Sequence, residues 1–65
     1  MNARERIIAI FMKRDGLSYE EAAEYLDEAI QACREAIDNG DDADEVWMDE
    51  TFLEPDYMYA VLFGV

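Results

Sequence analysis

The sequence contains no histidine, one cysteine and only five basic residues among its 65 positions. Without histidine, and with a single thiol at Cys33, neither an ordinary zinc site nor a disulfide within the chain is expected. The longest apolar runs, residues 7–12 and 58–63, fall far short of the ~20 residues that a membrane-spanning helix needs. We therefore expect a cytoplasmic protein with no metal and no cofactor.

Proline occurs once and glycine three times, so few positions can interrupt a helix. Ser18 and Glu21 form a capping box, in which each side chain accepts a hydrogen bond from the backbone N–H of the other residue. Similar helix-start and helix-stop signals are Asn2 with Glu5, Asp42 with Glu45, Gly16, Gly40, Pro55 and Gly64. We predict an all-α fold, a single domain over residues 1–65, with three to four helices at about residues 3–14, 19–39, 43–51 and 55–63.

The charge is strongly negative and unevenly distributed, with a net value of −12. Residues 1–14 contain four basic side chains and one acid, a net charge of +3. Residues 15–65 contain sixteen acids and one arginine, a net charge of −15. Direct binding to nucleic acid or to an anionic membrane is therefore not expected over most of the surface.

The segment from Ser18 to Gly40 has the longest helical pattern. Its predicted core stripe recurs at steps of three and four residues: Tyr19, Ala22, Ala23, Leu26, Ile30, Cys33 and Ile37. Polar and acidic residues fall mostly on the opposite side: Glu20, Glu24, Asp27, Glu28, Gln31, Glu35 and Asp38. This side is either an ordinary solvated face or a surface kept acidic to meet a basic partner. The absence of lysine within it favours the second interpretation.

The first predicted helix is apolar around more than half of its circumference, whereas a helix that faces one core needs only a ~100° stripe. Either this helix is sandwiched inside the fold, or its spare face packs on a second copy of the chain. The residues of that possible homodimer contact are Ile7, Ile8, Phe11 and Met12.

Three motifs that could carry chemistry fail on their spacing or surroundings. The acidic run from Asp38 to Glu45 does not fit a calcium-binding EF-hand loop, which needs glycine at position 6 and glutamate at position 12. The segment around Gly16 resembles the start of a DNA-reading helix, but acids follow it where phosphate-binding cations would be needed. Cys33 lies on the apolar stripe and is interpreted as a small buried hydrophobe. We do not expect an enzyme.

Aromatic side chains are concentrated near the C-terminus: Trp47, Phe52, Tyr57, Tyr59 and Phe63. One interpretation places them in the core. The alternative makes Trp47 or Tyr57 an anchor for a partner, because both residue types are frequent at the energetic centres of interfaces.

Two segments resemble short acidic proteins encoded by phages and prophages of Gram-positive bacteria. The first is residues 15–22, Asp-Gly-Leu-Ser-Tyr-Glu-Glu-Ala, which open a helix. The second comprises Trp-Met-Asp-Glu at residues 47–50 and Leu-Glu-Pro-Asp-Tyr at residues 53–57. The resemblance implies a phage setting, in which small acidic proteins often block host defence or nucleic-acid-handling enzymes. It assigns no activity and no functional residue.

These observations predict a small binding protein, an inhibitor that mimics nucleic acid and occupies a basic surface. Twelve net charges correspond to roughly 20 Å of duplex DNA, which carries one charge per ≈ 1.7 Å. The alternatives are a homodimeric structural protein and a regulator of the antitoxin or antirepressor kind. The predicted partner-binding residues are Glu20, Glu24, Asp27, Glu28, Glu35, Asp41, Asp42, Asp44, Glu45, Trp47 and Tyr57.

Overall fold

The computed structural model describes residues 2–64, which form four α-helices joined by short turns. The helices are α1 (Ala3–Asp15), α2 (Tyr19–Asp38), α3 (Ala43–Thr51) and α4 (Pro55–Phe63). This confirms the predicted all-α fold, and each helix end lies within one residue of its predicted position. None of the helices within residues 2–64 combines the length and hydrophobicity that crossing a membrane requires.

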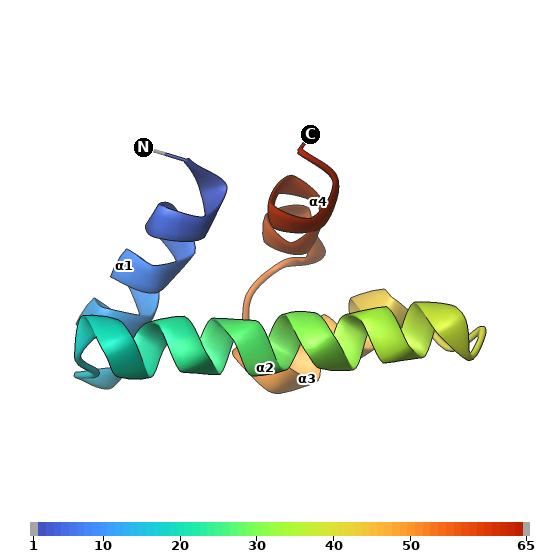
Figure 1. Cartoon of the computed structure of the whole chain (residues 1–65), viewed down its shortest axis with the longest axis horizontal. Helices are drawn as coiled ribbons and strands as arrows, with labels where there is room; N and C mark the ends of the chain where they lie inside the picture. Colours follow the sequence, from blue (N-terminus) through green and yellow to red (C-terminus); the bar gives the residue numbers. More distant parts are fainter. Residues whose placement is uncertain (1, 65) are drawn as a thin grey trace.

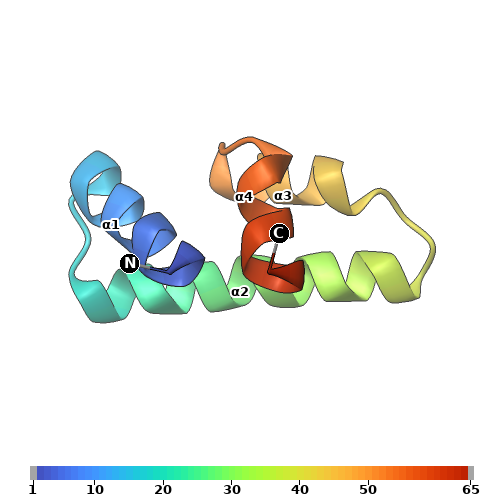
Figure 2. The same ribbon diagram turned by 90° about the horizontal axis from the view of Figure 1, so that it is seen from above.

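Helix α2 determines the shape of the molecule. It runs along the longest dimension of a body that measures 33 × 20 × 17 Å (Figure 1). Helices α1 and α4 lie on one side of α2, and α3 packs beside α2 after the chain reverses at residues 39–42 (Figure 2). All three shorter helices therefore leave one long side of α2 uncovered.

The helix starts follow from local hydrogen bonds. The capping box of α2 is complete: Glu21 N–H donates to Ser18 Oγ at 3.2 Å, and Ser18 N–H donates to Glu21 Oε1 at 3.0 Å. Asn2 caps α1 through a 2.8 Å bond from Glu5 N–H, and Asp42 caps α3. The Glu5 carboxylate accepts from the Tyr19 hydroxyl at 2.9 Å.

The core draws on all four helices. Its fully buried side chains are Ile7, Ile8, Phe11, Ala22, Leu26, Ala29, Cys33, Trp47 and Met58. Helix α1 contacts both α2 and α4, so it is sandwiched. The homodimer contact predicted on this helix is therefore wrong for three of its four residues, Ile7, Ile8 and Phe11, which lie inside the core. Only Met12 is exposed.

The buried side of α2 is rotated relative to the predicted stripe. The sequence pattern predicts Tyr19 and Ile37 in the core, but they are about half exposed, at 48% and 47%. Ala29 and Ala36, which the prediction left out, are buried. Small side chains let the backbones of packed helices approach closely, so the contact between α2 and α3 uses alanine rather than the larger apolar residues.

Candidate partner-binding surface

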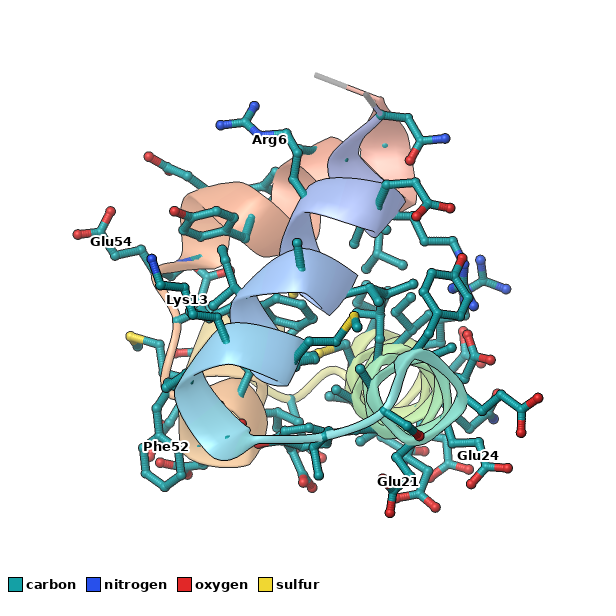
Figure 3. The ribbon with its side chains drawn as sticks, turned by 90° about the vertical axis from the view of Figure 1, so that its left-hand side faces the viewer. Arg6, Lys13, Glu21, Glu24, Phe52 and Glu54 are labelled. Atoms are coloured by element: carbon teal, nitrogen blue, oxygen red, sulfur yellow. The ribbon has the colours of Figure 1, made fainter. Side chains whose placement is uncertain are left out.

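The uncovered side of α2 is predominantly acidic, with Gln31 among its acids and Arg34, the one base of the helix, at its edge. We call it the acidic face, and its residues are Glu20, Glu24, Asp27, Glu28, Glu35 and Asp38. At about 100° per residue, these six positions fall within about 100° of one another around the helix axis. All six are exposed. Figure 3 shows Glu24 and the neighbouring Glu21 pointing away from the body of the protein.

Few of these charges are neutralised within the molecule. Among residues 2–64, two ion pairs form, Arg4–Asp27 at 2.7 Å and Arg14–Asp15 at 2.7 Å. Two of the seventeen acids are thus paired with a base of residues 2–64, and fifteen have no such pair there. Asp27 is therefore the one member of the acidic face with an internal counter-charge in this part of the chain. The other five present carboxylates that a cationic partner could reach.

The predicted acids of the turn between α2 and α3 divide into two groups. Asp42 Oδ1 accepts from Asp44 N–H at 3.1 Å, and Asp44 Oδ1 accepts from the Tyr59 hydroxyl at 2.5 Å. This second bond raises the pKa of Tyr59 and ties α4 to the start of α3. Asp42 and Asp44 therefore have structural roles, whereas Asp41 and Glu45 are exposed at the turn and in the first turn of α3.

No metal site accompanies these acids. Within residues 2–64, no group of three or more histidine, cysteine, aspartate or glutamate side chains is arranged to hold an ion. Asp42 caps the N-terminus of α3, and Asp44 and Glu45 lie in its first turn, where the positive end of the helix dipole stabilises negative charge.

The two aromatic residues predicted as anchors do not lie on the acidic face. Trp47 is fully buried, and its indole Nε1–H donates to the Glu54 carbonyl oxygen at 3.0 Å. The anchor interpretation of Trp47 is wrong, because the α3–α4 connection covers it. Tyr57 is partly buried and lines an open groove of about 270 Å³ with Arg6, Glu54 and other residues of α1 and α4. In Figure 3, Arg6 and Glu54 lie on the side of the molecule away from Glu21 and Glu24.

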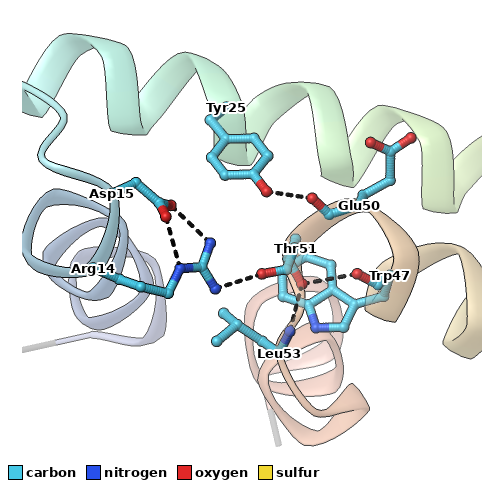
Figure 4. Close-up of polar contacts among 7 residues, drawn as sticks. All are labelled: Arg14, Asp15, Tyr25, Trp47, Glu50, Thr51 and Leu53. Carbon is cyan, nitrogen blue, oxygen red and sulfur yellow. Dashed lines mark hydrogen bonds and ion pairs between the residues drawn. The ribbon is translucent and has the colours of Figure 1, made fainter.

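The C-terminal end of α3 is held by side chains from two other helices (Figure 4). Arg14 Nη1 donates to the Thr51 carbonyl oxygen at 2.7 Å, and the Tyr25 hydroxyl donates to the Glu50 carbonyl oxygen. The buried Thr51 hydroxyl donates to the Trp47 carbonyl oxygen at 2.8 Å. The same hydroxyl accepts from the Leu53 N–H at 3.1 Å. These bonds satisfy backbone groups that a helix end leaves without internal partners.

This network adjoins Phe52, one of the five aromatic residues that one interpretation of the sequence places in the core. Phe52 follows Thr51 directly, has φ of 58° and leaves 80% of its surface exposed. Met48, one turn earlier on α3, is 42% exposed. Glu45 and Asp49 are also exposed on α3; Glu45 lies three residues before Met48, and Asp49 lies three residues before Phe52. An exposed apolar pair thus lies close to acids of α3.

Phe52 also borders an open groove. The groove has a volume of about 450 Å³ and is lined by Arg14, Asp15, Leu17, Tyr25 and Phe52. Figure 3 shows the Phe52 ring at the lower left of the molecule, below Lys13, with Glu21 and Glu24 at the lower right. No local sequence signal distinguishes Phe52 from a core aromatic, because its exposure depends on the left-handed turn that ends α3.

Comparisons with protein-family models, curated proteins and solved structures found no match.

Proposed function

We propose that this protein is an inhibitory binding module that uses the acidic face of α2 to occupy a basic, nucleic-acid-binding surface of another protein. The observation that supports this proposal best is the alignment of six carboxylates along one uncovered helix side, five of them without an ion pair among the described residues. An ordinary surface helix mixes charges of both signs, because pairs of opposite charge four residues apart stabilise it.

The spacing of the carboxylates suits a surface that follows a phosphate chain. Helix α2 has 20 residues and is therefore ~30 Å long. Its acidic face carries about one charge per 5 Å, compared with one per ~3.4 Å for each strand of DNA and one per ~1.7 Å for the duplex. The acidic face thus comes nearer to the charge density of one strand than to that of a duplex. The exposed acids of α3 add further charges beside this line.

Like-charge repulsion within α2 also supports a binding role. Glu20 and Glu24, and Glu24 and Glu28, are four residues apart, and each such pair costs a few tenths of a kcal/mol. A cationic surface would relieve this repulsion on binding. The long-range attraction would also speed association and weaken as salt is added.

The homodimer alternative is not favoured by the fold. Three of its four contact residues are in the core, and two copies that each carry −12 repel one another. A phage-encoded protein that acts on a host enzyme in the cytoplasm would fit the proposed mechanism. The basis for that setting is the sequence resemblance alone.

The test is affinity capture from a bacterial lysate on the immobilised protein, followed by displacement of a labelled single-stranded oligonucleotide from each captured protein. We expect the captured partner to elute as salt rises from about 50 to 200 mM, and to release its oligonucleotide when the protein is added. Capture that does not respond to salt, or a partner that keeps its oligonucleotide, would contradict the proposal.

A matched pair of double variants distinguishes the effect of the acidic face from the effect of the net charge. Glu24→Gln with Glu28→Gln removes two charges from the face, whereas Glu54→Gln with Asp56→Asn removes two charges from the start of α4. Both changes preserve side-chain size. We expect the first double variant to displace the oligonucleotide about tenfold less effectively and the second to act like the unaltered protein. Equal effects of the two would show that overall charge, rather than the acidic face, is responsible.

A further inference from the structure

We infer that Phe52, with Met48 one turn before it, is the apolar anchor of the partner-binding surface, and that the partner is a basic protein surface with an apolar recess among its cations. This inference rests on the proposed function and names the contact that gives it specificity. It replaces Trp47, which is buried, as the aromatic anchor.

The first argument is the conformation of Phe52. Among residues 2–64 it is the single residue other than glycine with positive φ, at 58°. Glycine adopts this left-handed conformation freely, whereas a residue with a side chain does so only under strain. The other left-handed helix ends in this chain, at Gly16 and Gly64, have glycine. A phenylalanine at such a position, with 80% of its surface in water, contributes little to the core in return.

The second argument is the rigidity of its support. Residues on both sides of Phe52 are fixed: the Thr51 carbonyl by Arg14, and the Leu53 N–H by the Thr51 hydroxyl. The Phe52 N–H itself donates to the Met48 carbonyl oxygen at 2.9 Å. An anchor held in one backbone conformation before binding loses less conformational entropy when it enters a pocket.

The third argument is charge complementarity, which decides the occupant. Glu45 and Asp49 are exposed on α3 within one turn of Met48 and Phe52. Arg14, the cation that lines the Phe52 groove, is already paired with Asp15. A partner that covers this patch must therefore bring cations around an apolar recess. A second copy of the chain has a net charge of −12, so electrostatic repulsion disfavours self-association through Phe52.

The experiment uses two synthetic peptides of equal length and charge as probes. One alternates lysine with serine, and the other has leucine in place of serine, so only the second offers apolar contacts. Binding of each is measured by titration calorimetry with the intact protein and with Phe52→Ala, Phe52→Gly and Phe63→Ala. Phe63 is the matched control, because it is a second exposed aromatic, at 57%, at the end of α4.

We expect both Phe52 variants to bind the lysine–leucine peptide about tenfold more weakly and the lysine–serine peptide unchanged, whereas Phe63→Ala changes neither. Phe52→Gly should also raise the midpoint of urea denaturation, because glycine relieves the left-handed strain. A purely structural role for Phe52 would instead lower that midpoint.

Two results would overturn the inference while leaving the proposed function in place. The first is lysine–leucine binding that does not change in the Phe52 variants. The second is a concentration-dependent dimer in sedimentation that Phe52→Ala abolishes, which would make a second copy the occupant. If Glu24→Gln with Glu28→Gln leaves the binding of both peptides unchanged, the proposed function itself fails.

Discussion

Arg14 Nη1 donates to the carbonyl oxygen of Thr51 at 2.7 Å, which joins the last turn of α1 to the end of α3 across 37 residues of sequence. The same guanidinium pairs with Asp15 and lies 5.3 Å from the centre of the Phe11 ring. Helix α3 has no basic residue in its own last turn. Arg14 therefore supplies from another helix the positive charge that stabilises a helix C-terminus.

Replacing Arg14 should destabilise the fold. Arg14→Ala removes the bond to the Thr51 carbonyl and the contact with Phe11, so we expect a loss of about 1–2 kcal/mol in the free energy of unfolding. Urea denaturation followed by circular dichroism measures it. Lys13→Ala, on the exposed side of the same turn, is the control and should change stability by no more than ~0.5 kcal/mol. Equal effects of the two variants would contradict the role of Arg14.

The buried Thr51 hydroxyl should be essential to the turn after α3. Thr51→Val keeps the shape of the side chain but leaves the Leu53 N–H without its acceptor, which we expect to cost about 1–3 kcal/mol. Hydrogen exchange gives the more specific readout, because the Leu53 amide should lose its protection. Thr51→Ser restores the hydroxyl and should restore that protection. A protected Leu53 amide in Thr51→Val would show that another acceptor serves it.

Removing charge from the middle of the acidic face should stabilise the isolated protein. Glu24 has like-charged neighbours four residues away on both sides, so Glu24→Gln should raise the free energy of unfolding by about 0.5 kcal/mol. Glu24→Lys, which turns both repulsions into attractions, should raise it further. Both gains should shrink in high salt, since screening weakens exposed charge interactions. A decrease in stability would mean that Glu24 makes a favourable contact within the fold.

The capping box of α2 should give stability a local dependence on pH. The backbone N–H of Ser18, which donates to the carboxylate, lowers the pKa of Glu21 below its ordinary value of 4.5. A lowered pKa in the folded state means that the contribution is present above 4.5 and is lost as pH falls through the folded pKa. The difference in unfolding free energy between the protein and Glu21→Gln should therefore be positive at neutral pH and disappear in acid. A difference independent of pH would contradict this account.

The helix ends could be predicted because they are set by short-range chemistry. Ser18 with Glu21, Asn2 and Asp42 each bond within three residues, and glycine at position 16 takes the left-handed conformation that ends α1. Such signals are contained in a few neighbouring residues. The acidic face could be predicted for the same reason, since the spacing of acids along one helix determines which side they share.

The burial of individual side chains could not be predicted to the same degree. Ala29 and Ala36 are buried while Ile37 is half exposed, because the contact with α3 determines which side of α2 faces inward. Hydrophobicity alone would predict that Ile37 is buried and that the two alanines are exposed. Trp47 and Phe52 differ in the same way, since the chain after α3 covers the first and leaves the second in water. The bond from Arg14 to Thr51 joins residues too distant in sequence for any local pattern to indicate.

The complete enclosure of Trp47 gives this protein a built-in optical reporter. It is the one tryptophan in the sequence and none of its surface is exposed, so its emission should lie at short wavelength in the native state. Unfolding would bring the indole into water and shift the emission to the red. Because its indole N–H donates a hydrogen bond to the Glu54 carbonyl oxygen at the start of α4, the emission should also detect release of α4 alone. Conformational change on meeting a partner could thus be followed without any added label.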